Sequence, residues 1–185
     1  AGRPLAILEI AAGTGVVTRA LAPHLGEWAH YVVTDLNRPM RDRARVRQGP
    51  DSRIEWRAAD AAALPFADQS FDRVCCQFGA MFFSDRIEAF SEARRVLKPG
   101  GVFVFNVWDR IEDNLFADLV TSALATLFPD NPPRFLARTP HGYSDRDVIQ
   151  NDLRQAGFAD ISIETLTTTS AAASPRHPAL AYCQG

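Results

Sequence analysis

Short apolar runs alternate with segments of helical periodicity along the first hundred residues. An apolar run of about four to eight residues, bounded by glycine or polar residues, is typical of a buried strand. Such runs predict strands at residues 5–10, 31–34, 71–78 and 102–105, and alternating apolar and polar residues predict one at 54–58. Between them, apolar residues at every third or fourth position predict helices over residues 14–25 and 39–46. A further helix begins at the capping box of Asp85 and Glu88 and ends before Lys98.

This rhythm predicts an α/β fold, a three-layer Rossmann-like sandwich with a mostly parallel central sheet and helices on both faces. Residues 1–110 would form that core. The pattern then changes to a helix at 115–128 with a broad apolar face and a loop at 129–143 rich in proline and arginine. We therefore expect residues 111–145 to be an insertion or lid over a substrate site.

The last part of the chain, residues 146–185, would complete the same domain. We predict a helix that Ser144 and Asp147 open and Gly157 closes, a strand over residues 158–167, and a final helix from Ser174 and Pro175. Because the chain starts at Ala1 and stops shortly after that last helix begins, we expect a fragment of a longer protein.

Size and charge narrow the possible functions. A chain of 185 residues with a net charge of −2 suits one globular domain and gives no sign of a dominant nucleic-acid or membrane partner. No apolar run approaches the roughly 20 residues that span a bilayer. Two of the three cysteines are adjacent, which argues against a disulfide framework and for the cytoplasm. His24, His30 and His177 form no cluster with metal-ligand spacing, so no metal is predicted.

The strongest chemical signal is the run Glu9-Ile10-Ala11-Ala12-Gly13-Thr14-Gly15, which joins the first strand to the first helix. Glycines at this position let the backbone turn tightly and approach a ligand closely. Asp35 ends the second strand, where a carboxylate can accept hydrogen bonds from both hydroxyls of a ribose. The ordered set predicts a site for a cofactor that contains adenosine.

The same run argues against a dinucleotide. A pyrophosphate normally needs Gly-x-Gly-x-x-Gly, but the third glycine is replaced here by Thr18. Glu9 adds a negative charge that disfavours a pyrophosphate and favours a ligand with a positive charge, such as an ammonium group. The residues therefore favour a cofactor other than NAD.

Four ordered motifs resemble those of Rossmann-like, S-adenosylmethionine-dependent methyltransferases. Leu8-Glu9-Ile10-Ala11-Ala12-Gly13-Thr14-Gly15 resembles their first motif, and Asp35-Leu36-Asn37-Arg38-Pro39-Met40 their second. The third and fourth are similar to Ala59-Asp60-Ala61 with Leu64-Pro65-Phe66 and Phe71-Asp72, and to Arg95-Val96-Leu97-Lys98-Pro99-Gly100-Gly101. Cys76-Gln77-Phe78-Gly79-Ala80-Met81-Phe82-Phe83 resembles the small-molecule branch that includes the ubiquinone and menaquinone biosynthesis enzymes.

The resemblance implies S-adenosylmethionine as cofactor and S-adenosylhomocysteine as product. Glu9 would lie near the methionine ammonium, Asp35 would bind the ribose, and Met40 would pack on the adenine. Asp60 and the Ala61 amide would bind the adenine edge, and Gln77 and Phe78 would face the reacting methyl. The implied cofactor-binding set is Glu9, Ala11, Gly13, Thr14, Gly15, Asp35, Leu36, Met40, Asp60, Ala61, Gln77 and Phe78. The family usually has glycine in place of Ala11, so we expect a slightly wider turn.

A sulfonium methyl is already electrophilic, so the enzyme has mainly to align the nucleophile with it. A base is needed only where the acceptor must lose a proton. No motif identifies a catalytic residue, and the candidates are His141 and Tyr143 in the lid and Gln77. We expect a small-molecule methyl acceptor, in-line displacement, and a monomer or homodimer.

Several alternatives remain at this point. An NAD-dependent oxidoreductase and a protein that binds S-adenosylmethionine without catalysis both fit the fold, while aminopropyl transfer lacks an acidic polyamine site. Five arginines could meet phosphates, although a solvated helix face explains them as well: Arg38, Arg41, Arg43, Arg45 and Arg47. Asn131-Pro132-Pro133 resembles a motif of amine methyltransferases but follows the wrong strand, so we interpret it as part of the lid.

Overall fold

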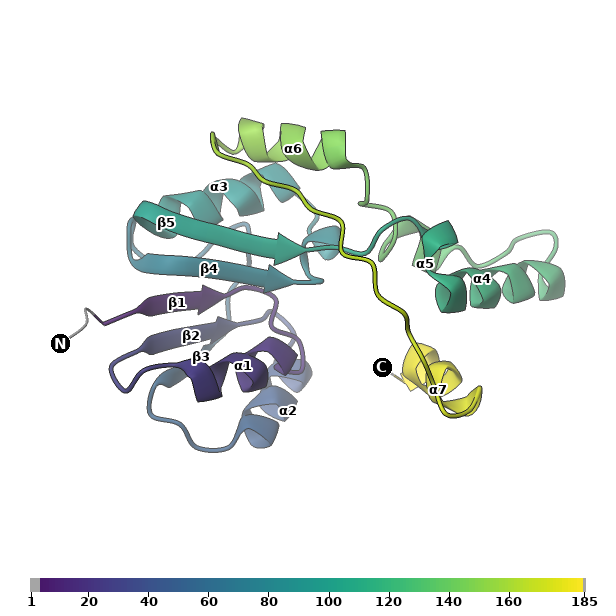
Figure 1. The fold of residues 1–185 in the computed structure, drawn as a ribbon, viewed down its shortest axis with the longest axis horizontal. Coiled ribbons are helices and arrows are strands. Elements are labelled where there is room, and N and C mark those ends of the chain that lie inside the picture. The colour runs from purple at the N-terminus through teal and green to yellow at the C-terminus, as the bar shows by residue number, and fades with distance from the viewer. Residues whose placement is uncertain (1–3, 185) are drawn as a thin grey trace.

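A five-stranded parallel sheet forms the centre of the computed structural model, which describes residues 4–184, with side chains described up to residue 181. The strands are β1 (Ala6–Glu9), β2 (His30–Thr34), β3 (Ile54–Arg57), β4 (Phe71–Gln77) and β5 (Leu97–Asn106). Their order is β3-β2-β1-β4-β5, and every pairing is parallel (Figure 1). The predicted α/β fold is therefore confirmed.

Helices cover the sheet and continue beyond it. They are α1 (Val16–Leu21), α2 (Arg38–Gln48), α3 (Arg86–Val96), α4 (Leu115–Leu127), α5 (Phe135–Arg138), α6 (Arg146–Gln155) and α7 (Arg176–Gln184). Short 3-10 turns lie at η1 (Ala22–His24), η2 (Ala80–Phe82) and η3 (Ile111–Asp113). Figure 1 shows α4 and α5 projecting from the end of the sheet at which the strands finish.

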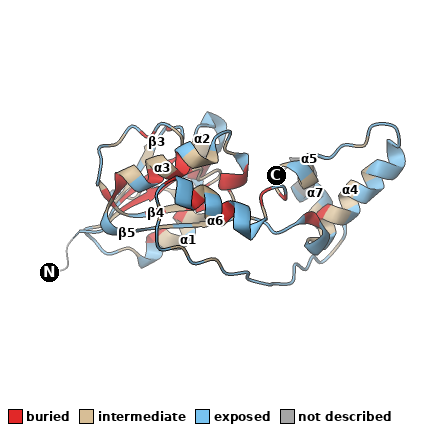
Figure 2. Ribbon diagram, turned by 90° about the horizontal axis from the view of Figure 1, so that it is seen from above, coloured by how far each residue is buried: buried red, intermediate tan, exposed pale blue. Residues whose placement is uncertain are grey.

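Alternate strand residues feed two hydrophobic cores, as the period of two in a β-strand requires. On one face, Ile7, Tyr31 and Val33 pack with Leu21 of α1. On the other face, buried strand residues join the apolar sides of α3 and α6 in a larger core whose members include Leu8, Val32, Val74, Phe90, Ile149 and Leu153. Figure 2 places most of the buried residues in this sheet and its flanking helices.

The helix before β5 ends where the sequence predicted, but the strand begins earlier. Leu97 already pairs with Phe71, and the register then shifts between Phe71 and Arg73. Lys98 forms a 2.9 Å ion pair with Asp72 beside this irregularity. Residues 97–101 of the sequence motif therefore belong to the strand itself, whereas Arg95 and Val96 end α3.

Two predicted elements differ in the structure. The helix predicted at residues 14–25 is α1, which ends at Leu21 and is followed by the 3-10 turn η1, with Pro23 in its first turn. The strand predicted at residues 158–167 is wrong, because this segment is extended but has no strand assignment. Its alternating Ile161 and Ile163 do pack against the core, yet no described strand lies beside it to complete a ladder. Alternating apolar and polar residues indicate that one face of a segment is buried. A β-strand also needs a neighbouring strand for its backbone hydrogen bonds.

The region after β5 is more exposed than the core. In α4 only Ala117 is fully buried, and Leu115, Leu119 and Leu127 are exposed. Figure 2 shows α4 largely in the exposed colour. The loop predicted at 129–143 contains the short helix α5, and the helix predicted from Ser174 and Pro175 begins at Arg176. Within residues 4–184, no helix combines the length and apolarity needed to cross a membrane.

Candidate functional site

The carboxyl ends of β1, β2 and β4 meet at one edge of the sheet. The chain runs from β1 through β2 to β3 on one side and then returns to place β4 on the other side of β1. The point at which the strand order reverses is where open α/β sheets bind ligands. Of the predicted cofactor residues, Glu9 and Gln77 are the last residues of β1 and β4, and the others follow β1, β2, β3 or β4.

The turn after β1 is held to both neighbouring strands. The Ile10 amide donates to the Cys75 carbonyl at 2.8 Å, and the Ala12 amide donates to the Thr34 carbonyl at 2.9 Å. Gly15 then caps α1 with a φ of 73°, and a Cβ at this position would lie 2.9 Å from the Ala44 Cβ of α2. Glycine is required there both for the left-handed backbone and for the close approach of α2.

Ala11 adopts the left-handed conformation that glycine usually supplies, with a φ of 53°. Its methyl group lies against Gly79, where an added Cβ would be 2.7 Å from the Ala11 Cβ. The turn nevertheless closes, since the Gly15 amide donates to the Ala12 carbonyl at 2.9 Å. Ala11 therefore keeps the glycine conformation, and Gly79 compensates for the extra methyl.

Asp35 is bonded to the glycine turn. Its Oδ2 accepts from the Gly13 amide at 2.8 Å, and its Oδ1 accepts from the Asn37 amide at 2.7 Å. The Asp35 side chain is half-buried at the edge of the sheet. Each carboxylate oxygen can accept a further hydrogen bond, so the group still has capacity for ligand hydroxyls.

Glu9 lies beneath the turn and is only 2% exposed. Its Oε2 accepts hydrogen bonds from the Thr18 hydroxyl at 2.7 Å and from the Tyr31 hydroxyl. Burial raises the pKa of Glu9, while the bonds from Tyr31 and Thr18 lower it in part. The structure thus turns this carboxylate toward α1 and β2, so any effect on a ligand above the turn would act through its charge.

The predicted adenine contacts follow β2 and β3. Met40 is 39% exposed and Leu36 66% exposed, while Ala61 is buried and the Asp60 side chain is exposed. Asp60 Oδ1 accepts from the Ala62 amide at 3.0 Å. Because β2 and β3 pair in parallel, the segments that carry these residues both start at the same edge of the sheet.

An arginine that sequence reasoning did not single out as a site residue holds the loop after β3. Arg95 of α3 donates to the carbonyl oxygens of Leu64 and Phe66 at 2.9 and 2.8 Å. It also contacts Glu92 at 2.6 Å and Asp68 at 2.7 Å, and these bonds raise its pKa. The Leu64 amide donates in turn to Glu92 at 2.7 Å. This network fixes the loop that begins with Asp60.

Gln77 and Phe78 lie at the end of β4, as predicted. Gln77 is exposed, and Phe78 has a φ of 51°. The Phe78 amide donates to the backbone and side-chain oxygens of Asn106, both at 3.1 Å. The Phe78 ring stacks on Trp108 with a centroid separation of 4.0 Å and an angle of 8°. Trp108 was missed from the sequence, although its position just after β5 could have marked it.

The two candidate bases in residues 111–145, the segment predicted to be a lid, have different surroundings. His141 is 8% exposed, its Nδ1 lies 2.8 Å from the Asp109 carbonyl oxygen, and its ring centroid is 6.2 Å from that of Trp108. Tyr143 is in the core, donates to Asp152 at 2.8 Å, and carries the Arg86 guanidinium 4.2 Å from its ring centroid. Burial raises the pKa of Tyr143. His141 therefore lies beside Trp108, whereas the hydroxyl of Tyr143 is bonded within the core.

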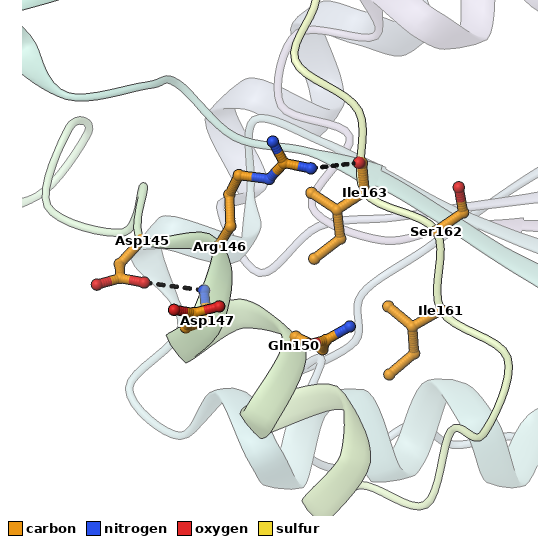
Figure 3. A pocket seen from close by; sticks show the side chains of 7 residues that line it. All are labelled: Asp145, Arg146, Asp147, Gln150, Ile161, Ser162 and Ile163. Atoms are coloured by element: carbon orange, nitrogen blue, oxygen red, sulfur yellow. Dashed lines mark hydrogen bonds between the residues drawn. The ribbon is translucent and has the colours of Figure 1, made fainter.

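A separate cleft of about 640 Å³ lies between the start of α6 and residues 161–163 (Figure 3). Its lining is Asp145, Arg146, Asp147, Gln150, Ile161, Ser162 and Ile163. Figure 3 shows Arg146 donating to the Ile163 carbonyl, and that bond is 2.8 Å long. None of the residues predicted for the cofactor or the acceptor lines this cleft, so we do not connect it with the chemistry.

Comparisons with known proteins identify the family to which the sheet and its carboxyl-terminal edge belong. Residues 8–105 match the family model described as "Methyltransferase domain". A demethylmenaquinone methyltransferase from Clavibacter sepedonicus is 34% identical over 87% of this chain and 68% of that protein. A ubiquinone/menaquinone biosynthesis C-methyltransferase from Stutzerimonas stutzeri is 28% identical over the same shares of the two chains.

Solved structures show the same fold. A phosphoethanolamine N-methyltransferase 2 from Haemonchus contortus, in complex with S-adenosyl-L-methionine, aligns with a TM-score of 0.67 and 24% identity. That match covers 90% of this chain and 36% of the other. An S-adenosylmethionine-dependent methyltransferase from Mesorhizobium loti aligns with a TM-score of 0.61 and 24% identity, covering 84% and 74%.

Proposed function

This chain belongs to the methyltransferase domain family, and from that premise we propose that it methylates a ring carbon of a small hydroxylated aromatic molecule. S-adenosylmethionine is the methyl donor, and the reaction class is methyl transfer to a small-molecule acceptor. Because the chain belongs to this family, the alternative of an NAD-dependent oxidoreductase is rejected. The proposal concerns the acceptor and the residues that serve it.

The observation that supports the placement of the cofactor is the hydrogen bond between the Gly13 amide and Asp35 at the edge where the strand order reverses. It joins the glycine turn to the acidic end of β2, and the carboxylate keeps capacity for the two ribose hydroxyls. Glu9 and Asp60 add further negative charge along the same edge. Such an environment suits a ligand that carries sulfonium and ammonium charges and disfavours a pyrophosphate.

The position of each residue determines which part of the cofactor or acceptor it would contact. Asp35 would bind the ribose, and Met40 and Leu36 would cover the adenine, whose edge would meet Asp60 and the Ala61 amide. Gly13, Thr14, Gly15 and Ala11 would form the floor. Gln77 and Phe78, at the end of β4, would face the methyl group and orient the acceptor.

The acceptor is inferred from the surroundings of Phe78. Its stacked partner Trp108, whose ring centroid lies 6.2 Å from that of His141, makes the surroundings of Phe78 aromatic. The names of the relatives refer to demethylmenaquinone and to the biosynthesis of ubiquinone and menaquinone. The reduced form of a quinone is a ring with two hydroxyl groups. We infer that residues 111–145 act as a lid over such a ring. A cytoplasmic location and a monomeric or homodimeric state, without a nucleic-acid or membrane partner, remain predictions from the sequence.

Methyl transfer to a defined ring tests this proposal. The chain would be incubated anaerobically with S-adenosylmethionine and 1,4-dihydroxynaphthalene, and the products would be separated and analysed by mass spectrometry and NMR. We expect S-adenosylhomocysteine and a naphthalene diol with one methyl group on a ring carbon. Methylation on oxygen would refute the carbon assignment. Binding of S-adenosylmethionine with no transfer to a panel of hydroxylated rings would refute the acceptor class.

A further inference from the structure

We propose that Trp108 is the stacking surface for the acceptor ring and that Nε2 of His141 is the base that takes a hydroxyl proton from it. This inference rests on the proposed function and names two residues that no motif assigns. It connects Phe78 at the end of β4, Trp108 after β5 and His141 in the lid into one aromatic row.

The row starts beside the predicted methyl position. Phe78 follows β4 directly, and its neighbour Gly79 touches Ala11 of the glycine turn. The Phe78 ring lies parallel to Trp108, which fixes the indole, while 41% of Trp108 stays exposed. A large aromatic side chain that is stacked on one face and partly exposed is suited to stacking a planar ligand.

His141 is held in place by two hydrogen bonds. Its amide donates to the Leu136 carbonyl at 3.0 Å, and its Nδ1 lies 2.8 Å from the Asp109 carbonyl oxygen. A backbone carbonyl can only accept, so Nδ1 carries the proton in the neutral ring and Nε2 holds the lone pair. The fold thus selects the nitrogen that can act as a base, and the imidazole plane makes an angle of 41° with the indole plane of Trp108.

The geometry supports a defined proton transfer. Nε2 of His141 takes the proton of an acceptor hydroxyl, and the electron pair of the O–H bond moves into the ring. The ring carbon next to that hydroxyl then forms a bond to the methyl group as the methyl–sulfur bond breaks, and its electron pair stays on sulfur. The ring C–H proton is lost to water to restore aromaticity, and the protonated His141 returns its proton to the oxygen. One methyl replaces one hydrogen, and one proton is released overall.

Two measurements on the same variants test the two roles. Binding of 1,4-dihydroxynaphthalene is measured by calorimetry in the presence of S-adenosylhomocysteine, and turnover is measured with S-adenosylmethionine. Trp108→Ala should weaken ring binding about 10-fold or more, while Trp108→Phe should retain most of it. His141→Asn keeps an N–H near the Nδ1 position for the Asp109 carbonyl but lacks Nε2. It should bind the ring like the parent and lose about 100-fold in turnover.

The controls are a tryptophan and a histidine exposed at the opposite end of the sheet. Trp28→Ala and His24→Asn should change neither binding nor turnover. Unchanged ring binding in Trp108→Ala would overturn the stacking role, and turnover within a few-fold of the parent in His141→Asn would overturn the base. If the parent binds the ring through Trp108 but transfers no methyl, the proposed function fails and the base assignment fails with it. If the parent does not bind the ring, the stacking surface is refuted.

Discussion

The Gly13 amide donates a 2.8 Å hydrogen bond to Oδ2 of Asp35, 22 residues further along the chain. The bond ties the turn after β1 to the end of β2. Because the other carboxylate oxygen accepts from the Asn37 amide, the acidic group is fixed before any ligand arrives. A group that is already fixed loses less conformational freedom on binding, which favours affinity.

Substitutions of Asp35 should separate this structural role from ligand binding. Asp35→Ala leaves the Gly13 amide without its partner and should lower the free energy of unfolding by about 1 kcal/mol. Asp35→Asn retains an oxygen that can accept from the Gly13 amide, so its free energy of unfolding should fall less than that of Asp35→Ala. Urea denaturation of both variants measures the difference. Equal stability of Asp35→Ala and the parent would show that this bond does not hold the turn.

Glu9 should make the folded chain less stable as the pH rises, which is opposite to the effect of an acidic group whose pKa is lowered by folding. Burial raises its pKa above the ordinary 4.5, so the folded chain holds this proton more tightly than the unfolded chain. Its contribution to stability is therefore full below pH 4.5 and declines as the pH rises through the folded pKa. Glu9→Gln stays neutral and should exceed the parent in stability by an amount that grows with pH above 4.5.

Denaturation of the parent and of Glu9→Gln at a series of pH values checks this. Glu164→Gln, on the exposed segment after α6, is the control and should follow the parent. A stability difference between parent and Glu9→Gln that does not change with pH would contradict the account. In Glu9→Gln, loss of the buried negative charge should also weaken S-adenosylmethionine binding.

Arg95 should matter for both stability and the cofactor. Arg95→Ala removes bonds to two carbonyl oxygens and two carboxylates, so we expect a loss of about 2 kcal/mol in the free energy of unfolding. The loop that begins with Asp60 should loosen, and S-adenosylmethionine should bind more weakly. Arg43→Ala, on the exposed side of α2, is the matched control for thermal unfolding and calorimetry. A change no larger than in that control would contradict the assigned role.

Ala11 offers a test of backbone strain. Its φ of 53° is unfavourable for an L-residue with a Cβ, so Ala11→Gly should raise the free energy of unfolding by about 0.5–1 kcal/mol. Ala12→Gly in the same turn should instead lower it, since Ala12 is not among the residues with positive φ. Chemical denaturation of both variants and the parent measures these changes in the free energy of unfolding. Destabilisation by Ala11→Gly would mean that the contact of its methyl with Gly79 outweighs the strain.

The central sheet and the cofactor edge could be predicted because each depends on local signals. The apolar runs of β1 and β4 specify buried strands, and Gly13, Gly15 and Asp35 follow strand ends at known offsets. The hydrogen bond from Gly13 to Asp35 is a consequence of the parallel pairing of β1 with β2.

Other features depend on contacts that no local pattern reports. Residues 158–167 alternate like a strand, but a ladder needs a neighbour. The sequence predicts Glu9 near the methionine ammonium, but it does not reveal that the carboxylate accepts hydrogen bonds from Thr18 and Tyr31. His141 and Tyr143 are two residues apart in the sequence, yet one is bonded to Asp109 near Trp108 and the other to Asp152 in the core.

Calorimetric titration of the parent and of Asp35→Ala with S-adenosylmethionine, S-adenosylhomocysteine and NAD tests the central claim most directly. A carboxylate that binds both ribose hydroxyls contributes charge-assisted hydrogen bonds, whose loss should weaken binding about 10-fold or more. We predict that the parent binds both adenosyl compounds and not NAD, and that Asp35→Ala binds both more weakly. Binding of NAD by the parent, or equal affinity of the two proteins for S-adenosylmethionine, would contradict the account.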